Sequence, residues 1–306
     1  MIAASVSQAT LGAAAESVIQ RALSRGGRAT SKPRGEVGAV ASVTLDGTPS
    51  VAAAWRKLLP RVDLSMVGVF CHGSPMVDVS YSNGTTGRCE LADLLLVVDE
   101  TDRHGAVKDR RANLVQAKLL AGGTLKTSSV QHHLLTGWPS FSFASGAYGS
   151  APRDFSASGL PGRTDESGRY GAIDLLSTPR SWKQNLPATH NTAGDSLGSF
   201  LAGMLLGIPG FGRKAIKGAG DDWSSTMDEL LTVTALQPLH HSSSLRSGRS
   251  RLRGVFAFAL VLDDPLNTGA FAVSFDPPPI EEPPGERPAR ERGISVIRIL
   301  AHNREG

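Results

Sequence analysis

Apolar residues recur at helical and strand spacings along the chain, and together these spacings predict an α/β protein. Residues 13–24 and 50–59 have apolar positions on one helical face, and a glycine pair and Pro60 follow these two segments as stops. Residues 37–45 are rich in β-branched side chains, which favours a strand. Helices and strands therefore alternate from the start of the chain.

Further strands and helices follow from the same patterns. Strands are expected at 64–72, 75–81, 92–100, 112–120, 169–176, 255–264 and 293–302. Helices are expected within 129–141, 194–207 and 221–236. The strands at 92–100 and 112–120 carry apolar runs without alternation, which indicates burial on both faces. The polar connection 101–111 between them predicts an antiparallel pair joined by a long loop, in a sheet with helices on both sides.

Composition supports a folded protein with a substantial core. The chain has 306 residues, of which 40% are hydrophobic and 20% are charged. This length predicts one large domain or two modest ones. The formal net charge of +4 comes from 32 basic and 28 acidic residues, a mild excess that permits a polyanionic partner without requiring one.

Cysteine content and hydropathy indicate a cytoplasmic protein without a membrane span. Cys71 and Cys89 are too few for a disulfide scaffold, and each is interpreted as a small buried hydrophobic residue. The first residues lack the basic-then-apolar order of a signal peptide, and no window reaches about 18 uninterrupted apolar residues.

Polar side chains stand at the ends of the two strands that are predicted to be buried. Glu90 and Asp93 precede the apolar run of 92–100, and Gln116 and Lys118 lie near the end of 112–120. Hard divalent cations bind carboxylate and carbonyl oxygens, which Asp93, the Gln116 amide and the backbone carbonyl of Ala117 provide. Lys118 shares a strand face with Gln116, so its ammonium is suited to orient a water or stabilise charge on a phosphate. The simpler alternative is that these strand ends emerge into water.

The pattern of Asp93 followed by Gln116-x-Lys118 resembles the PD-(D/E)XK nuclease superfamily, also called restriction-endonuclease-like. The resemblance covers roughly residues 10–145. It implies a restriction-endonuclease-like core with a central mixed β-sheet flanked by helices, and Mg²⁺- or Mn²⁺-dependent cleavage of DNA. It also implies that Asp93 and Gln116 hold the metal and that Lys118 acts on the attacking water or the phosphate. A role in bacterial defence or DNA processing goes with this resemblance.

Two positions depart from the superfamily pattern. Ala92 replaces the motif proline, which is a common variation, and Gln116 replaces an acid, which weakens metal binding unless another carboxylate helps. Glu90 is one candidate, although strict alternation places it on the face opposite to Asp93 unless the strand bends. Glu16 on the first helix is another, because helix glutamates assist the metal site in parts of the superfamily.

The sequence predicts three regions. Residues 1–145 form the nuclease-like core with the candidate metal site, and 146–169 form a Gly/Ser/Pro-rich loop. Residues 170–306 form a C-terminal α/β elaboration that completes the core or packs on it, with flexible segments at 240–253 and 276–292.

Two other functions stay open at this stage. The same fold would serve as a non-catalytic module that binds nucleic acid or a partner protein if Gln116 has weakened the metal site. It would also serve as a structural subunit of a larger assembly, as a homo-oligomer or with partner subunits of a defence system.

Overall fold

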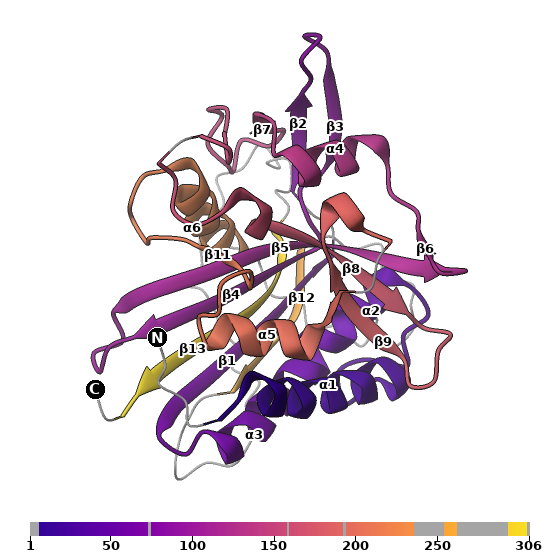
Figure 1. Cartoon of the computed structure of the whole chain (residues 1–306), viewed down its shortest axis with the longest axis vertical. Helices are drawn as coiled ribbons and strands as arrows, with labels where there is room; N and C mark the ends of the chain where they lie inside the picture. The colour runs from indigo at the N-terminus through magenta and orange to yellow at the C-terminus, as the bar shows by residue number, and fades with distance from the viewer. Residues whose placement is uncertain are drawn as a thin grey trace, which may run out of the picture.

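The structure is a computed structural model that describes residues 6–72, 75–157, 159–191, 194–235, 254–261 and 293–304. Figure 1 shows its helices and strands. The helical elements are α1 (Gln8–Arg25), α2 (Glu36–Ser42), the π-helix η1 (Val43–Gly47), α3 (Thr48–Leu58), α4 (Ser129–Gly137), the 3-10 helices η2 (Thr164–Glu166) and η3 (Pro187–Thr189), α5 (Leu197–Leu205) and α6 (Asp222–Ala235). The strands are β1 (Val62–His72), β2 (Met76–Ser80), β3 (Thr86–Glu90), β4 (Leu94–Thr101), β5 (Val107–Ala121), β6 (Thr124–Leu125), β7 (Phe141–Phe143), β8 (Gly168–Asp174), β9 (Ser181–Asn185), β10 (Asp195–Ser196), β11 (Arg213–Lys214), β12 (Gly254–Val261) and β13 (Ser295–Asn303).

A large mixed sheet forms the centre of the molecule. Its strand order is β10-β9-β8-β5-β4-β13-β1-β12, and the short strands β6 and β11 also pair with β5. The pairs β13–β4 and β5–β8 are parallel, and the other pairs are antiparallel. A smaller sheet, β3-β2-β7, carries the hairpin that projects at the top of Figure 1. The prediction of an α/β protein with a mixed sheet between helices is confirmed.

Helices cover both faces of the large sheet, which explains the unbroken apolar runs. The first core joins α1, α3 and α5 to one face, and the second joins α4, α6 and the small sheet to the other. Every residue from Leu94 to Val98 is buried, because successive side chains enter the two cores in turn. Each such large aliphatic side chain contributes about 1.5–3 kcal/mol by leaving water.

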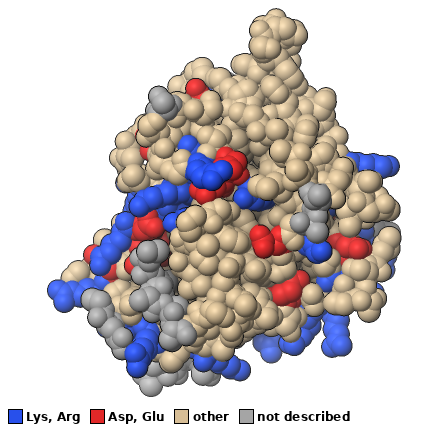
Figure 2. All heavy atoms as spheres, in the orientation of Figure 1, with Lys and Arg blue, Asp and Glu red and all other residues tan. Residues whose placement is uncertain are grey.

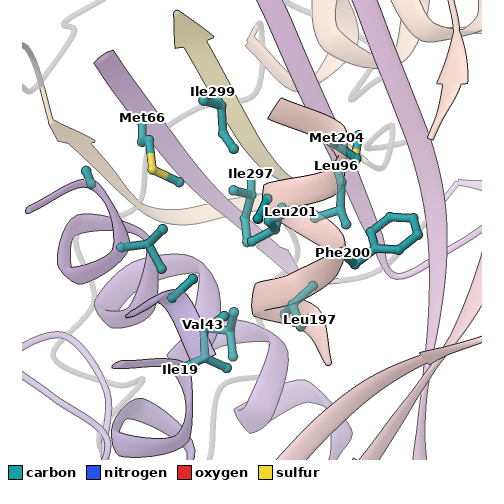
Figure 3. Packing of buried hydrophobic residues seen from close by; sticks show 14 of the residues in the cluster. Ile19, Val43, Met66, Leu96, Leu197, Phe200, Leu201, Met204, Ile297 and Ile299 are labelled. Carbon is teal, nitrogen blue, oxygen red and sulfur yellow. The ribbon is translucent and has the colours of Figure 1, made fainter. Parts of the chain in front are cut away.

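Helix α5 shows how a helical pattern docks on the sheet. Leu197, Leu201 and Met204 recur at helical spacing and are all buried. Figure 3 shows Leu201 beside Ile297 of β13 and Met204 beside Leu96 of β4. The helix therefore packs across strands that are two hundred residues apart in the sequence.

The C-terminal strand lies inside the sheet. β13 pairs with β1 on one side, where Leu64 faces Ala301, and with β4 on the other, where Leu96 faces Ile297. β8 likewise pairs with β5. The N-terminal and C-terminal parts of the chain thus build one sheet together.

The predicted strand at 37–45 is wrong, because this stretch is helical in α2 and η1. The β-branched residues favour a strand locally, but Val40 and Val43 pack in the first core between α1 and the sheet, while Val37 is exposed. Gly68 on β1 permits this close approach, since a Cβ there would lie 2.1 Å from the carbonyl oxygen of Thr44. Tertiary packing outweighs the local preference.

The connection predicted at 101–111 is much shorter in the structure. β4 continues to Thr101 and β5 begins at Val107, so the two strands are joined by a tight turn. Asp102 Oδ1 accepts hydrogen bonds from His104 N (2.8 Å) and Ala106 N (2.9 Å), which stabilises the turn. The antiparallel pairing itself is confirmed.

The sequence pattern predicts no helix or strand in three segments, at 146–169, 240–253 and 276–292. Segment 146–169 contains little regular structure, but its side chains Tyr148 and Phe155 are buried in the second core. The segments 240–253 and 276–292, which the sequence predicts to be flexible, lie outside the described residues.

The two cysteines are free and buried, as expected. Burial raises the pKa of the Cys71 thiol to about 12, which keeps it protonated. Among the helices that the structure describes, none combines the length and the apolar character needed to span a bilayer.

Candidate metal site at the ends of β4 and β5

The antiparallel pairing of β4 and β5 brings Asp93 to Gln116. Leu94 faces Val115 in the register of the two strands, so the residue before β4 meets the residue after Val115. Asp93 N also donates a hydrogen bond to Val115 O (2.9 Å), which continues the ladder by one residue. The backbone therefore determines where the Asp93 side chain begins.

Two amide donors bind one oxygen of the Asp93 carboxylate. Ala117 N donates to Asp93 Oδ2 over 2.8 Å, and Gln116 Nε2 donates to the same oxygen. Ala117 therefore contributes its backbone N–H here, whereas a metal-binding role for its carbonyl oxygen stays a prediction. These two bonds hold the carboxylate in one orientation just before β4 begins, beside β5.

The amide of Gln116 is fully buried and only half satisfied. Its Nε2 binds Asp93, but its Oε1 has no hydrogen-bond partner among the described residues. Oxygen and nitrogen of an amide are assigned from the hydrogen-bond network and exchange places when the group turns over. After such a turn, Gln116 Oε1 and Asp93 Oδ2 would face each other, an arrangement that a hard cation between two oxygens satisfies.

The carboxyl group of Asp93 has a pKa raised from its ordinary value of 3.8 to about 7. Burial is the largest cause, and the charge of Glu90 and the weaker effect of Glu36 act in the same direction. Lys118 and the N–H of Ala117 lower the pKa, but they do not outweigh the burial. The site thus disfavours the negative charge on Asp93 until a cation joins it.

Glu36 belongs to this group of residues, and sequence reasoning missed it. It is the first residue of α2, and its Oε1 accepts a hydrogen bond from Leu119 N (2.9 Å). Its Oε2 lies 3.8 Å from Lys118 Nζ. An acidic residue in the first turn is a helix signal, but the β-branched residues that follow it at 37–45 favour a strand, so the local pattern does not single out Glu36.

Glu90 lies close enough to Asp93 for its charge to raise the Asp93 pKa. It is the last residue of β3 and faces Met76 of β2, so it belongs to the small sheet. Strand alternation does not run from Glu90 to Asp93, because the chain leaves β3 at Leu91 and enters β4 only at Leu94. Strict alternation therefore does not place Glu90 on the face opposite to Asp93.

Glu16 is engaged elsewhere in the structure. Its carboxylate accepts hydrogen bonds from Gln20 Nε2 (3.1 Å) on its own helix and from Gly198 N (3.3 Å) at the start of α5. Glu16 is also absent from the charged groups that shift the pKa of Asp93. The structure does not bring Glu16 to Asp93, and the helix carboxylate near the site is Glu36.

The site offers few charged or imidazole side chains as metal ligands. Within the described ranges, no three His, Cys, Asp or Glu side chains converge as a metal centre. What converges is one carboxylate, an amide with a buried free oxygen, two further carboxylates nearby and one ammonium. Oxygen ligands of this kind suit Mg²⁺ or Mn²⁺ with several waters kept, and they do not suit a softer metal.

Comparison of the chain with models of protein families, with curated proteins and with solved structures finds no match.

Proposed function

We propose that this protein is a divalent-metal-dependent nuclease with a restriction-endonuclease-like core that hydrolyses DNA phosphodiester bonds. The observation that carries the proposal is the meeting of Asp93 and Gln116 side chains, with Lys118 two residues further along β5. Asp93 and Gln116 Oε1 would hold Mg²⁺ or Mn²⁺, and Glu90 supplies further negative charge nearby. A carboxylate that burial keeps partly protonated, beside an orphaned amide oxygen, fits such a cation.

The residues of the chain divide the work of hydrolysis. When bound, the cation would lower the pKa of a water and offset charge on the phosphate. The Lys118 ammonium orients the attacking water or stabilises the added negative charge. Glu36 is a positioning residue, because it holds the end of β5 through Leu119 N and lies beside Lys118 Nζ. Ala117 N keeps the Asp93 carboxylate turned toward the site.

The biological setting belongs to the same proposal. A cytoplasmic location and a role in bacterial defence or DNA processing come with the resemblance to the superfamily. A homo-oligomer or partner subunits of a defence system would complete such a role.

A non-catalytic binding module is the second candidate. It is favoured by the uncharged Gln116, whose Nε2 already donates to the Asp93 oxygen that a metal would need. In that case the protein holds nucleic acid or a partner protein without cutting.

Plasmid cleavage separates these functions. Supercoiled plasmid is incubated with Mn²⁺ and the native protein, Asp93→Ala, Lys118→Ala or the control Glu16→Gln. Cleavage by the native protein and Glu16→Gln, lost in the other two variants, supports the nuclease. DNA binding that survives both variants without cutting supports the binding module. Absence of DNA affinity at low salt rejects the nuclease and a DNA-binding module, and leaves a protein-binding module or a structural subunit.

A further inference from the structure

The last turns of α1 and the segment that leads from them to α2 carry a dense group of positive charges. Residues 17–35 contain five Lys or Arg side chains and no Asp or Glu. All five are exposed, and four of them are called the basic connection below: Arg21, Arg25, Lys32 and Arg34. None of these four forms an ion pair with any residue of the described ranges. In Figure 2, Lys and Arg side chains also gather along the lower rim of the molecule, beneath α1.

The basic connection is held in place by hydrogen bonds to its backbone. Asp46 accepts hydrogen bonds from Ala29 N (3.0 Å) and from Thr30 N (3.0 Å) and Thr30 Oγ1 (2.6 Å). Arg180 Nη1 donates to Leu23 O (2.9 Å) and Pro33 O (2.8 Å), which ties the two ends of the connection together. The charged side chains therefore project from a fixed backbone, so less order is lost when they bind.

The basic connection leads directly to the candidate site. Arg34 is two residues before Glu36, whose carboxylate contacts Leu119 N and Lys118. A polyanion that lies along the connection would therefore pass beside the residues proposed to act on a phosphodiester. This continuity distinguishes it from basic side chains elsewhere, such as Arg103 and Lys108 at the far end of the β4–β5 pair.

The chemistry of the segment favours a phosphate backbone over a membrane surface. Between residues 17 and 35, Ile19, Ala22, Leu23 and Pro33 are buried, and no apolar side chain is fully exposed. A segment that inserts into a lipid surface places exposed apolar side chains between the headgroups, in addition to the contacts of its basic side chains. Lys and Arg side chains alone suit evenly spaced phosphates, which lie about 1.7 Å apart along the axis of duplex DNA.

We propose that Arg21, Arg25, Lys32 and Arg34 bind the phosphodiester backbone of duplex DNA next to the site of cleavage, without reading its sequence. This inference rests on the proposed function for its choice of DNA as substrate. Each phosphate that a side chain neutralises releases a condensed counterion, so the salt dependence of binding counts these contacts.

The test measures binding of a fluorescent 30-base-pair duplex to the full-length protein in EDTA, across a series of salt concentrations. The variant Arg25→Gln/Arg34→Gln is compared with the charge-matched control Arg103→Gln/Lys108→Gln. The slope of log affinity against log salt is expected to fall by roughly 2 in the first variant, from about 0.9 for each lost contact, and to stay unchanged in the control. Two duplexes of different sequence are expected to behave alike.

Other outcomes overturn the inference. Three of these concern the duplex: a slope that is unchanged in the first variant, a slope that falls equally in both double variants, or no binding at all. The fourth is that the first variant loses affinity only for vesicles that contain phosphatidylserine and not for the duplex. Plasmid cleavage in Mn²⁺ is measured beside the slopes. Cleavage that depends on Lys118, with an unchanged slope, rejects this inference and keeps the nuclease. A reduced slope with intact plasmid rejects the nuclease and keeps the DNA contact.

Discussion

Glu36 Oε2 lies 3.8 Å from Lys118 Nζ, while Glu36 Oε1 accepts a hydrogen bond from Leu119 N. One carboxylate at the start of α2 thus contacts both the side chain and the backbone at the end of β5. The N-terminus of a helix favours a negative charge, which stabilises Glu36 in this position. Lys118 therefore has a neighbour that keeps its ammonium near the site.

Glu36→Gln is expected to lower the rate of DNA cleavage about 10–100-fold, because Lys118 loses the carboxylate beside it and the site loses negative charge. The concentration of Mn²⁺ at half-maximal rate is expected to rise as well. Plasmid cleavage over a range of Mn²⁺ concentrations measures both effects.

Glu16→Gln is the matched control on another helix. It should leave cleavage unchanged and reduce the free energy of unfolding by about 1 kcal/mol, because the carboxylate at the N-terminus of α5 is lost. Equal losses of cleavage in the two variants would contradict the role given to Glu36.

The raised pKa of Asp93 predicts a pH dependence of stability. In the folded protein this pKa is about 7, against an ordinary value of 3.8, so the folded state binds the proton more tightly than the unfolded state. The free energy of unfolding should therefore decrease as pH rises from about 4 to 7 and level off above that. The Asn side chain of Asp93→Asn does not titrate. The melting temperature of this variant, relative to that of the native protein, should therefore increase as pH rises from about 4 to 7.

Thermal unfolding in metal-free buffer at several pH values measures this difference. A gap between the two melting temperatures that stays constant from pH 4 to 8 would show that Asp93 does not titrate as expected. Adding Mn²⁺ at pH 8 should raise the melting temperature of the native protein more than that of Asp93→Asn, because only the native carboxylate gains a partner charge.

Gln116→Glu is expected to strengthen metal binding at a cost in stability without metal. The new carboxylate would face Asp93, and two like charges at this distance repel each other. The melting temperature in EDTA should therefore fall at pH 8 and recover when Mn²⁺ is added, with a lower half-saturating metal concentration than for the native protein.

Gln184→Glu provides the comparison, since Gln184 is also a buried strand glutamine, with both amide atoms free of partners in the described structure. It should lose stability, and Mn²⁺ should not restore it. If Mn²⁺ rescues both variants alike, the metal does not bind at Gln116.

Asp99 joins three strands of the sheet and is expected to be critical for folding. It is fully buried on β4 and accepts hydrogen bonds from Arg110 Nε (2.6 Å) on β5 and Arg298 Nε (2.7 Å) on β13. Asp99→Ala should reduce the free energy of unfolding by about 3–5 kcal/mol, because the buried guanidinium of Arg110 loses a partner.

Urea unfolding measures this loss. Asp78→Ala, which breaks the exposed pair of Asp78 with Arg88, should change stability little, because water screens both charges. Similar losses in the two variants would indicate that the Asp99 cluster adds no more than a surface pair.

The local pattern predicted the parts of the fold that depend on neighbouring residues. The apolar runs of β4 and β5 predicted strands buried on both faces, and their closeness in sequence predicted antiparallel pairing. Asp93 and Gln116 then meet because each lies one position beyond paired residues. These features follow from strand periodicity and from one short turn.

Contacts between distant segments decided the rest. The helix at 36–42 forms because its buried face packs between α1 and the sheet, and this packing brings Glu36 to Lys118 across more than 80 residues. Glu16 binds the start of α5 for the same reason. β13 joins β1 and β4 at the centre of the sheet after a long intervening segment. Local preferences cannot specify such pairings, because burial and hydrogen bonding across the whole sheet determine which segments meet.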